Sequence, residues 1–112
     1  MIEIKSSKEE GIMLIEVIGE VDASSSIHLD NALNAALNNG EKKLMVNLEG
    51  LAYISSAGLG VFISHLEEFE GEGVQMILFG LIEAVKEVFQ ILGLEKLLVM
   101  TDTKEEAIAA FK

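Results

Sequence analysis

Short apolar runs alternate along this chain with stretches in which apolar residues recur every three or four positions. The run at 74–79 is almost continuously apolar, which is typical of a parallel strand covered on both faces. A stripe with helical spacing is formed by Leu29, Ala32, Leu33, Ala36 and Leu37. The alternation predicts an α/β fold. A length of 112 residues is enough for one domain, residues 1–112, with a single core.

The predicted elements follow one another in the order ββαβαβαβα. We expect strands over 2–6 and 12–21, a helix between the serines at 24–26 and Gly40, a strand over 44–48, a helix starting at Ser55 or Ser56, a strand over 74–79, a helix over 81–92, a strand over 97–100 and a helix over 103–111. Residues 7–11 should form the hairpin loop, and 50–53 should lead into a turn. Right-handed crossovers then predict a mixed, mostly parallel sheet of four to five strands, the first antiparallel, with about four helices.

Charge and composition disfavour several classes of function. A net charge of −11 would repel nucleic acid and anionic membranes, so a basic protein surface is the better partner, although acidity also serves solubility alone. The absence of cysteine excludes disulfides, thiolate catalysis and cysteine metal sites. No apolar run reaches the ~18 residues of a membrane span, and the first residues lack a signal-peptide pattern. The predicted location is therefore the cytoplasm.

Three loops should meet at the carboxyl ends of the parallel strands, where sites lie in open α/β sheets: 19–25, 50–60 and 79–81. In the second loop, Ser55 and Ser56 stand where an apolar run turns into a helix. Free amides and the partial positive charge of a helix start suit a phosphate, bound or covalently attached. The small residues Ala57, Gly58 and Gly60 would let another backbone come close. The competing interpretation is an N-cap serine and glycines that serve packing.

The remaining polar candidates indicate no catalysis. Asp22 could orient the hydroxyl of Ser56 or meet a partner, or it could be an ordinary turn or N-cap residue. His28 and His65 are expected to be exposed helix residues, because neither has a carboxylate or second histidine at ligand spacing. A Ser56–His65–Asp22 triad is rejected, since Ser56 lacks a G-x-S-x-G elbow and His65 is more than two turns along the same helix. No P-loop is present. We therefore predict no catalytic residues, no metal and no cofactor.

Four segments in order resemble the STAS domains of anti-sigma factor antagonists, over nearly the whole chain. Gly19-Glu20-Val21-Asp22 followed by Ser25-Ser26 is similar to the first motif of the family, and 47–60 is similar to its signature. The segments 92–97 and 103–107 resemble its two later motifs. The sequence departs from the family at Ser55, where many members have Asp, and at Ala57, where many have a second serine.

The resemblance implies a phosphorylation-controlled binding protein that is not an enzyme. Ser56 matches the phosphorylated serine, with Ser55 as the rival position. The implied partners are an anti-sigma factor that is also a serine kinase, which is bound by the unphosphorylated form, and a PP2C-like phosphatase. The residues expected to meet the partner are Asp22, Ser25, Ser55, Ser56, Ala57, Gly58 and Gly60. Two alternatives stay open: a scaffold in a signalling or transport assembly, and a subunit that binds a nucleotide or other small ligand at the same helix start.

Overall fold

The structure is a computed structural model that describes residues 2–112; Met1, the first residue of the predicted domain, lies outside the described residues. Its elements in chain order are β1 (Ile2–Glu9), β2 (Ile12–Val21), α1 (Ser26–Asn38), β3 (Lys43–Asn47), β4 (Leu51–Ile54), α2 (Ser56–Gly71), β5 (Gln75–Phe79), α3 (Glu83–Ile91), the 3₁₀ turn η1 (Leu94–Lys96), β6 (Val99–Thr101) and α4 (Lys104–Ala110). The predicted fold class and order of elements are confirmed. The structure adds β4 and η1.

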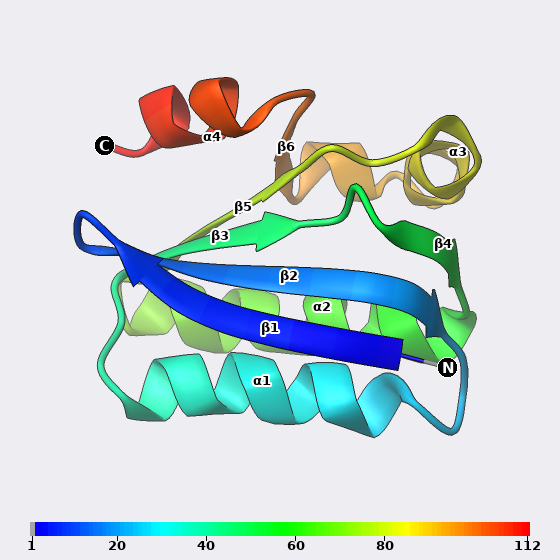
Figure 1. Cartoon of the computed structure of the whole chain (residues 1–112), viewed down its shortest axis with the longest axis horizontal. Coiled ribbons are helices and arrows are strands. Elements are labelled where there is room, and N and C mark those ends of the chain that lie inside the picture. The colour runs from blue at the N-terminus through cyan, green and yellow to red at the C-terminus, as the bar shows by residue number, and fades with distance from the viewer. Residues whose placement is uncertain (1) are drawn as a thin grey trace.

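One mixed sheet runs through the molecule (Figure 1). Its main path is β1-β2-β3-β5-β6, and β4 pairs with β2 beyond the end of β3. The β1–β2 pair is antiparallel and the other pairs are parallel, as predicted. The carboxyl ends of β2, β4, β5 and β6 therefore lie at the same end of the sheet, with the turn into α2 among them.

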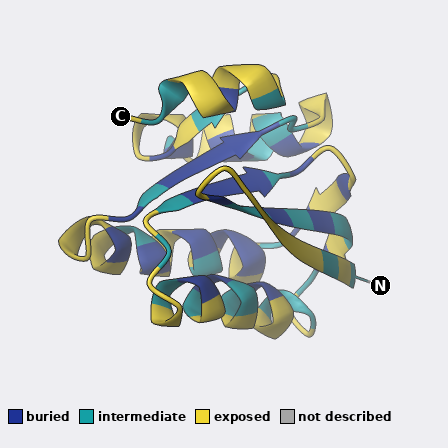
Figure 2. Ribbon diagram, turned by 60° about the vertical axis from the view of Figure 1, so that its left-hand side comes forward, coloured by how far each residue is buried: buried dark blue, intermediate teal, exposed yellow. Residues whose placement is uncertain are grey.

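Helices cover both faces of the sheet and divide the core in two. In Figure 2 the buried sides of α1 and α2 face the sheet and their exposed sides face outward. The larger cluster joins these helices to the sheet and includes Phe62 of α2 and Phe89 of α3, whose rings lie 6.0 Å apart. The smaller cluster lies under α4 and is built from Ile12, Met45, Ile77, Phe79 and Ala107. Within residues 2–112, no helix is long and apolar enough to cross a bilayer.

Two local predictions were wrong in the strands. The expected loop at 7–11 is a two-residue turn, because Glu10 and Gly11 both have positive φ (51° and 81°), as a tight type I′ hairpin requires. The segment 50–53 was expected to lead into a turn, but residues 51–54 form β4, which pairs with β2. Its two end residues are buried and its middle two exposed, so it lacks the alternation by which a strand is recognised.

The helix ends follow local chemistry only in part. The capping box at Thr103 and Glu106 starts α4 as predicted, and Gly40 has a positive φ just past α1. The serines before α1 do not cap it, because the N-cap Ser25 makes no side-chain bond to the helix. Their hydroxyls bond within the preceding loop instead.

The two histidines lie in different environments. His28 is exposed, as expected. His65 was expected to be exposed but is only 3% exposed, between α2 and α1. Its Nδ1 lies 2.8 Å from the carbonyl oxygen of Val61, and its Nε2 lies 3.0 Å from Oδ1 of Asn34. Burial is tolerated because both ring nitrogens have hydrogen-bond partners.

Candidate functional site

Two loops meet at the carboxyl end of the sheet. The backbone N–H of Ser55 donates a hydrogen bond of 2.8 Å to the carbonyl oxygen of Val21, and so joins the start of α2 to the end of β2. The pairing of β4 with β2 brings Ile54 opposite Val21. The predicted loops at 19–25 and 50–60 are therefore adjacent, as expected from parallel strands.

Ser55 and Ser56 have different surroundings. Ser55 is half-buried and is the N-cap of α2: its Oγ accepts a bond of 3.3 Å from the N–H of Gly58, and its carbonyl oxygen accepts from Leu59. Ser56 is exposed, and its hydroxyl makes no hydrogen bond to any residue within 2–112. It occupies the first helical position, where backbone N–H groups lack partners within the helix. An accessible hydroxyl thus stands at the positive end of a helix of 16 residues.

The three small residues after Ser56 differ in position. Ala57 and Gly60 are exposed beside it. Gly58 is buried, and a Cβ there would lie 2.7 Å from side-chain carbons of both Val21 and Ile54. This glycine therefore allows α2 to start directly against the ends of β2 and β4. The packing role considered from the sequence applies to Gly58, and its predicted contact with a partner stays a prediction.

Asp22 orders its own loop. One carboxylate oxygen accepts hydrogen bonds of 2.8–3.0 Å from the N–H groups and hydroxyls of Ser24 and Ser25. These bonds, first that from the Ser24 hydroxyl and then those from Ser25, lower the pKa of the Asp22 carboxyl from 3.8 to about 2. The hydroxyl of Ser25 also accepts from the N–H of Asp22 at 2.9 Å. Asp22 is thus a turn residue, and no hydrogen bond connects it to Ser56.

The sequence model of the STAS domain matches residues 3–107. The chain belongs to the STAS domain family. It is 33% identical over 108 residues to the candidate anti-sigma factor antagonist BtrV of Bordetella bronchiseptica, covering 94% of this chain and 90% of BtrV. It is 26% identical over 102 residues to an anti-sigma-B factor antagonist of Staphylococcus aureus, covering 91% and 94% of the two chains.

The anti-sigma factor antagonist SpoIIAA, whose structure is solved, has the same fold. The phosphorylated form of the Bacillus cell fate determinant SpoIIAA superposes on this STAS domain with a TM-score of 0.71, at 24% identity and with 97% of each chain covered. The recognition from four short motifs is therefore confirmed.

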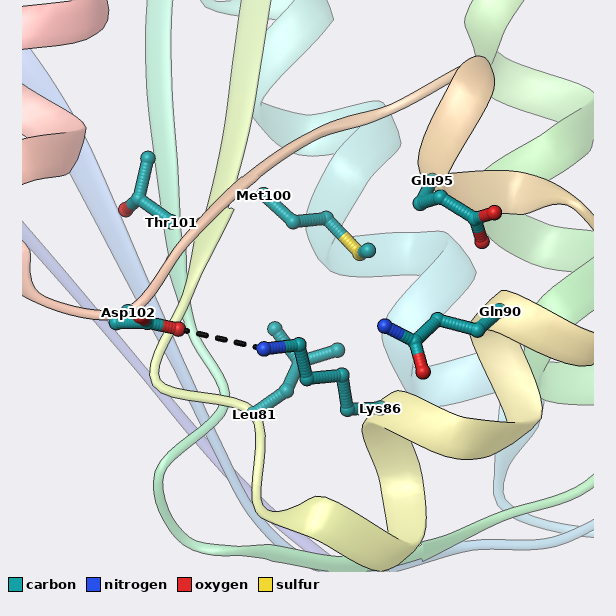
Figure 3. A pocket seen from close by; sticks show the side chains of 7 residues that line it. All are labelled: Leu81, Lys86, Gln90, Glu95, Met100, Thr101 and Asp102. Carbon is teal, nitrogen blue, oxygen red and sulfur yellow. Dashed lines mark ion pairs between the residues drawn. The ribbon is translucent and has the colours of Figure 1, made fainter.

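The third predicted loop of this STAS domain, residues 79–81, borders a pocket next to α3 (Figure 3). Leu81 lines it, and Lys86 of α3 forms an ion pair of 3.5 Å with Asp102 across it. Its volume of about 170 Å³ is small for a ligand site, for which ~300–1,000 Å³ is usual. Within residues 2–112, no three His, Asp or Glu side chains gather closely enough to hold a metal ion.

Sequence reasoning missed two exposed apolar side chains on the elements that flank Ser56. Tyr53 of β4 is 50% exposed, and Ile63 of α2 is 44% exposed. Tyr53 lies in the segment that was expected to lead into a turn, and Ile63 lies in the helix that was expected to start at Ser55 or Ser56. The available signal was charge, because 50–64 contains no Asp, Glu, Lys, Arg or His in a chain that is otherwise rich in acidic residues.

Proposed function

We propose that this STAS domain is an anti-sigma factor antagonist that binds an anti-sigma factor serine kinase while Ser56 is unmodified. Phosphorylation of Ser56 by that kinase ends the binding, and a PP2C-like phosphatase restores it. The domain acts in the cytoplasm, by binding alone and without catalysis. The names of its relatives support this proposal, as does the existence of a phosphorylated form of SpoIIAA.

The observation that carries the proposal is the free hydroxyl of Ser56 in a segment without charged residues. Ser56 lies within the charge-free segment 50–64, with Tyr53, Ala57 and Gly60 exposed on either side. A partner that covers this segment would desolvate no charge within the segment itself. A phosphate adds about −1.5 to −2 charges and three strong acceptors at its centre. A loss of ~3 kcal/mol through desolvation and poor fit would weaken binding on the order of 100-fold.

Ser56 is the better acceptor of the two serines. The hydroxyl of Ser55 already accepts the N–H of Gly58, and Ser55 is held to Val21 through its backbone. A kinase would have to break the helix cap to reach it. Ser56 presents its hydroxyl without disturbing any hydrogen bond among the described residues. We therefore assign the modification to Ser56 rather than to Ser55.

The direct experiment combines the full chain with an anti-sigma factor serine kinase of the same organism and ATP, followed by mass spectrometry of the phosphorylated peptide. We expect phosphate on Ser56, none in Ser56→Ala, and normal labelling in Ser55→Ala. Label that persists in Ser56→Ala and disappears in Ser55→Ala would reverse the assignment.

The binding switch has its own test. In a titration of the kinase by calorimetry, Ser56→Glu should weaken binding, while Ser56→Ala should bind as wild type because a methyl group adds no charge. Equal affinities for the Glu and Ala variants would argue against the switch even if Ser56 is phosphorylated.

A further inference from the structure

The β1 strand forms a long open edge of the sheet. It is the end strand of the sheet path and pairs with β2 along all eight of its residues, from Ile2 to Glu9. Figure 1 shows β1 at the front, in front of β2. An edge strand leaves a row of backbone N–H and C=O groups available to another strand. The edge of β1 contains no proline.

The charges of β1 balance in a chain that is otherwise strongly acidic. The strand contains two acidic residues, Glu3 and Glu9, and two lysines, Lys5 and Lys8, while the chain as a whole has a net charge of −11. Glu3 and Lys5 are each about 60% exposed and lie 3.7 Å apart as an ion pair within the strand, so pairing with a second copy would exchange or share this contact. A surface of zero net charge is the place where two copies of an acidic protein approach at the lowest electrostatic cost.

The two faces of β1 differ as alternation requires. Ile2 and Ile4 pack against the core on the α1 side, while Glu3 and Lys5 are exposed. A groove of about 340 Å³ opens between β1 and α1 and is lined by Ile2, Ile4, His28 and Ala32. The outer edge of β1 thus carries backbone groups, an apolar strip on one face and alternating charges on the other.

We propose that two copies of this chain dimerise by antiparallel pairing of β1 with β1 across a two-fold axis at Ile4. Such an axis places residues of one face opposite residues of the same face, so only pairings between odd and odd or even and even positions are allowed. Centring on Ile4 sets Glu3 of each copy opposite Lys5 of the other, which gives two such pairs. It also joins the two Ile4 side chains on the α1 side.

Neighbouring registers fit less well. Centring on Lys5 sets the two lysines opposite each other, and centring on Ser6 sets Glu3 opposite Glu9, which like-charge repulsion disfavours. Centring on Ser7 pairs Lys5 with Glu9 but loses the contact between the isoleucines. The charge pattern therefore selects the second copy as occupant and Ile4 as the centre.

The dimer leaves the surface around Ser56 open. β1 pairs with one edge of β2, and β4 pairs with the other edge. A second copy added to β1 extends the sheet away from β4 and from the start of α2. Each dimer would then present two Ser56 surfaces.

Sedimentation equilibrium of the full chain at physiological salt tests the proposal, from micromolar to millimolar protein. We expect a monomer–dimer equilibrium with a dissociation constant within this range, because strand pairing buries a small interface. Glu3→Lys should weaken the dimer about tenfold or more, and so should Lys5→Glu, because each variant creates two like-charge contacts. The double variant Glu3→Lys/Lys5→Glu should restore it.

Two variants separate pairing from overall repulsion. Glu3→Lys lowers the net negative charge, so general repulsion alone predicts a stronger dimer where strand pairing predicts a weaker one. Lys8→Glu changes the charge as Lys5→Glu does but lies outside the paired residues. It removes the ion pair of 3.2 Å between Lys8 and Glu41 within one copy, and it should leave the dimer close to wild type. A wild-type monomer at every concentration, a stronger dimer in Glu3→Lys, or no recovery in the double variant would each overturn the proposal.

Discussion

Two loops meet at the carboxyl end of the sheet, and they differ in whether their serine hydroxyls are hydrogen-bonded. Between β2 and α1, Asp22 accepts hydrogen bonds from Ser24 and Ser25, so both serines are used in holding the loop. Between β4 and α2, Ser55 caps the helix and Ser56 has no hydrogen-bond partner among residues 2–112. The first loop has a carboxylate to gather its donors, and the second has none.

The difference separates the proposed site of modification from the other serines of these loops. Serines near helix starts are abundant in this chain, so serine content alone does not identify a site. The absence of a local acceptor distinguishes Ser56 as our proposed site, because a hydroxyl without a partner among the described residues is free to meet an enzyme. The ordered Asp22 loop, linked to Ser55 through Val21, supports the turn that presents Ser56. Substitutions at Gly58 and Ser55 perturb the support, and substitution at Ser56 perturbs the presented hydroxyl.

The largest effect on the Ser56 turn is expected beneath it, at Gly58. An alanine there would place a Cβ 2.7 Å from side-chain carbons of Val21 and Ile54, whereas a Cβ at Gly60 has nothing within 4 Å. Both replacements gain helix propensity, up to ~1 kcal/mol, so their difference isolates the overlap. We expect Gly58→Ala to be less stable than Gly60→Ala by about 1–3 kcal/mol in urea unfolding. Equal stabilities would show that α2 does not need a glycine at this contact.

The next effect is the loss of the cap at Ser55. Ser55→Ala removes the acceptor for the N–H of Gly58 and should cost about 1 kcal/mol of unfolding free energy. Ser55→Asp is the matched control, because a carboxylate caps equally well and interacts favourably with the helix start. Chemical denaturation of both variants measures the difference. A Ser55→Ala protein as stable as Ser55→Asp would mean that the observed cap contributes nothing.

Much of this comparison could be predicted from the sequence. The alternation of apolar runs and helical stripes predicted the layers and the order of elements, because both depend on local periodicity. The joining of loops 19–25 and 50–60 followed from parallel strands. The capping box at Thr103 was equally local, and the structure confirms it.

What could not be predicted depends on contacts between distant residues. Helical spacing places His65 with Phe62 and Phe69 on the buried face of α2, although it was predicted to be exposed. Its burial is accommodated by Asn34, 31 residues away on α1, which meets its Nε2. β4 exists because β2 is free beyond the end of β3, and four residues with buried ends give no strand pattern. The hydroxyl of Ser25 is hydrogen-bonded and that of Ser56 is not, because one loop folds around Asp22 and the other has no such carboxylate.

The ordered loop should also show a characteristic pH response. Because its hydrogen bonds lower the pKa of the Asp22 carboxyl from 3.8 to about 2, the stability that Asp22 contributes is fully present above pH 3.8. It is lost as pH falls through the folded-state value. NMR titration of the carboxyl carbon should give a midpoint near 2, and Asp22→Asn should lack this acid dependence in urea unfolding. A midpoint near 3.8 would mean that Ser24 and Ser25 do not hold the carboxylate in solution.

The smallest effect on stability is expected at Ser56 itself. Its side chain is exposed and has no partner within residues 2–112, so Ser56→Ala should change the unfolding free energy by no more than about 0.5 kcal/mol. The same variant should accept no phosphate, while Ser55→Ala should be less stable and still accept it. This crossed pattern would separate the presented serine from the structural one. A loss of more than 1 kcal/mol in Ser56→Ala would show that its hydroxyl is engaged within the protein, and the contrast between the two loops would then fail because neither would leave a hydroxyl free for a kinase.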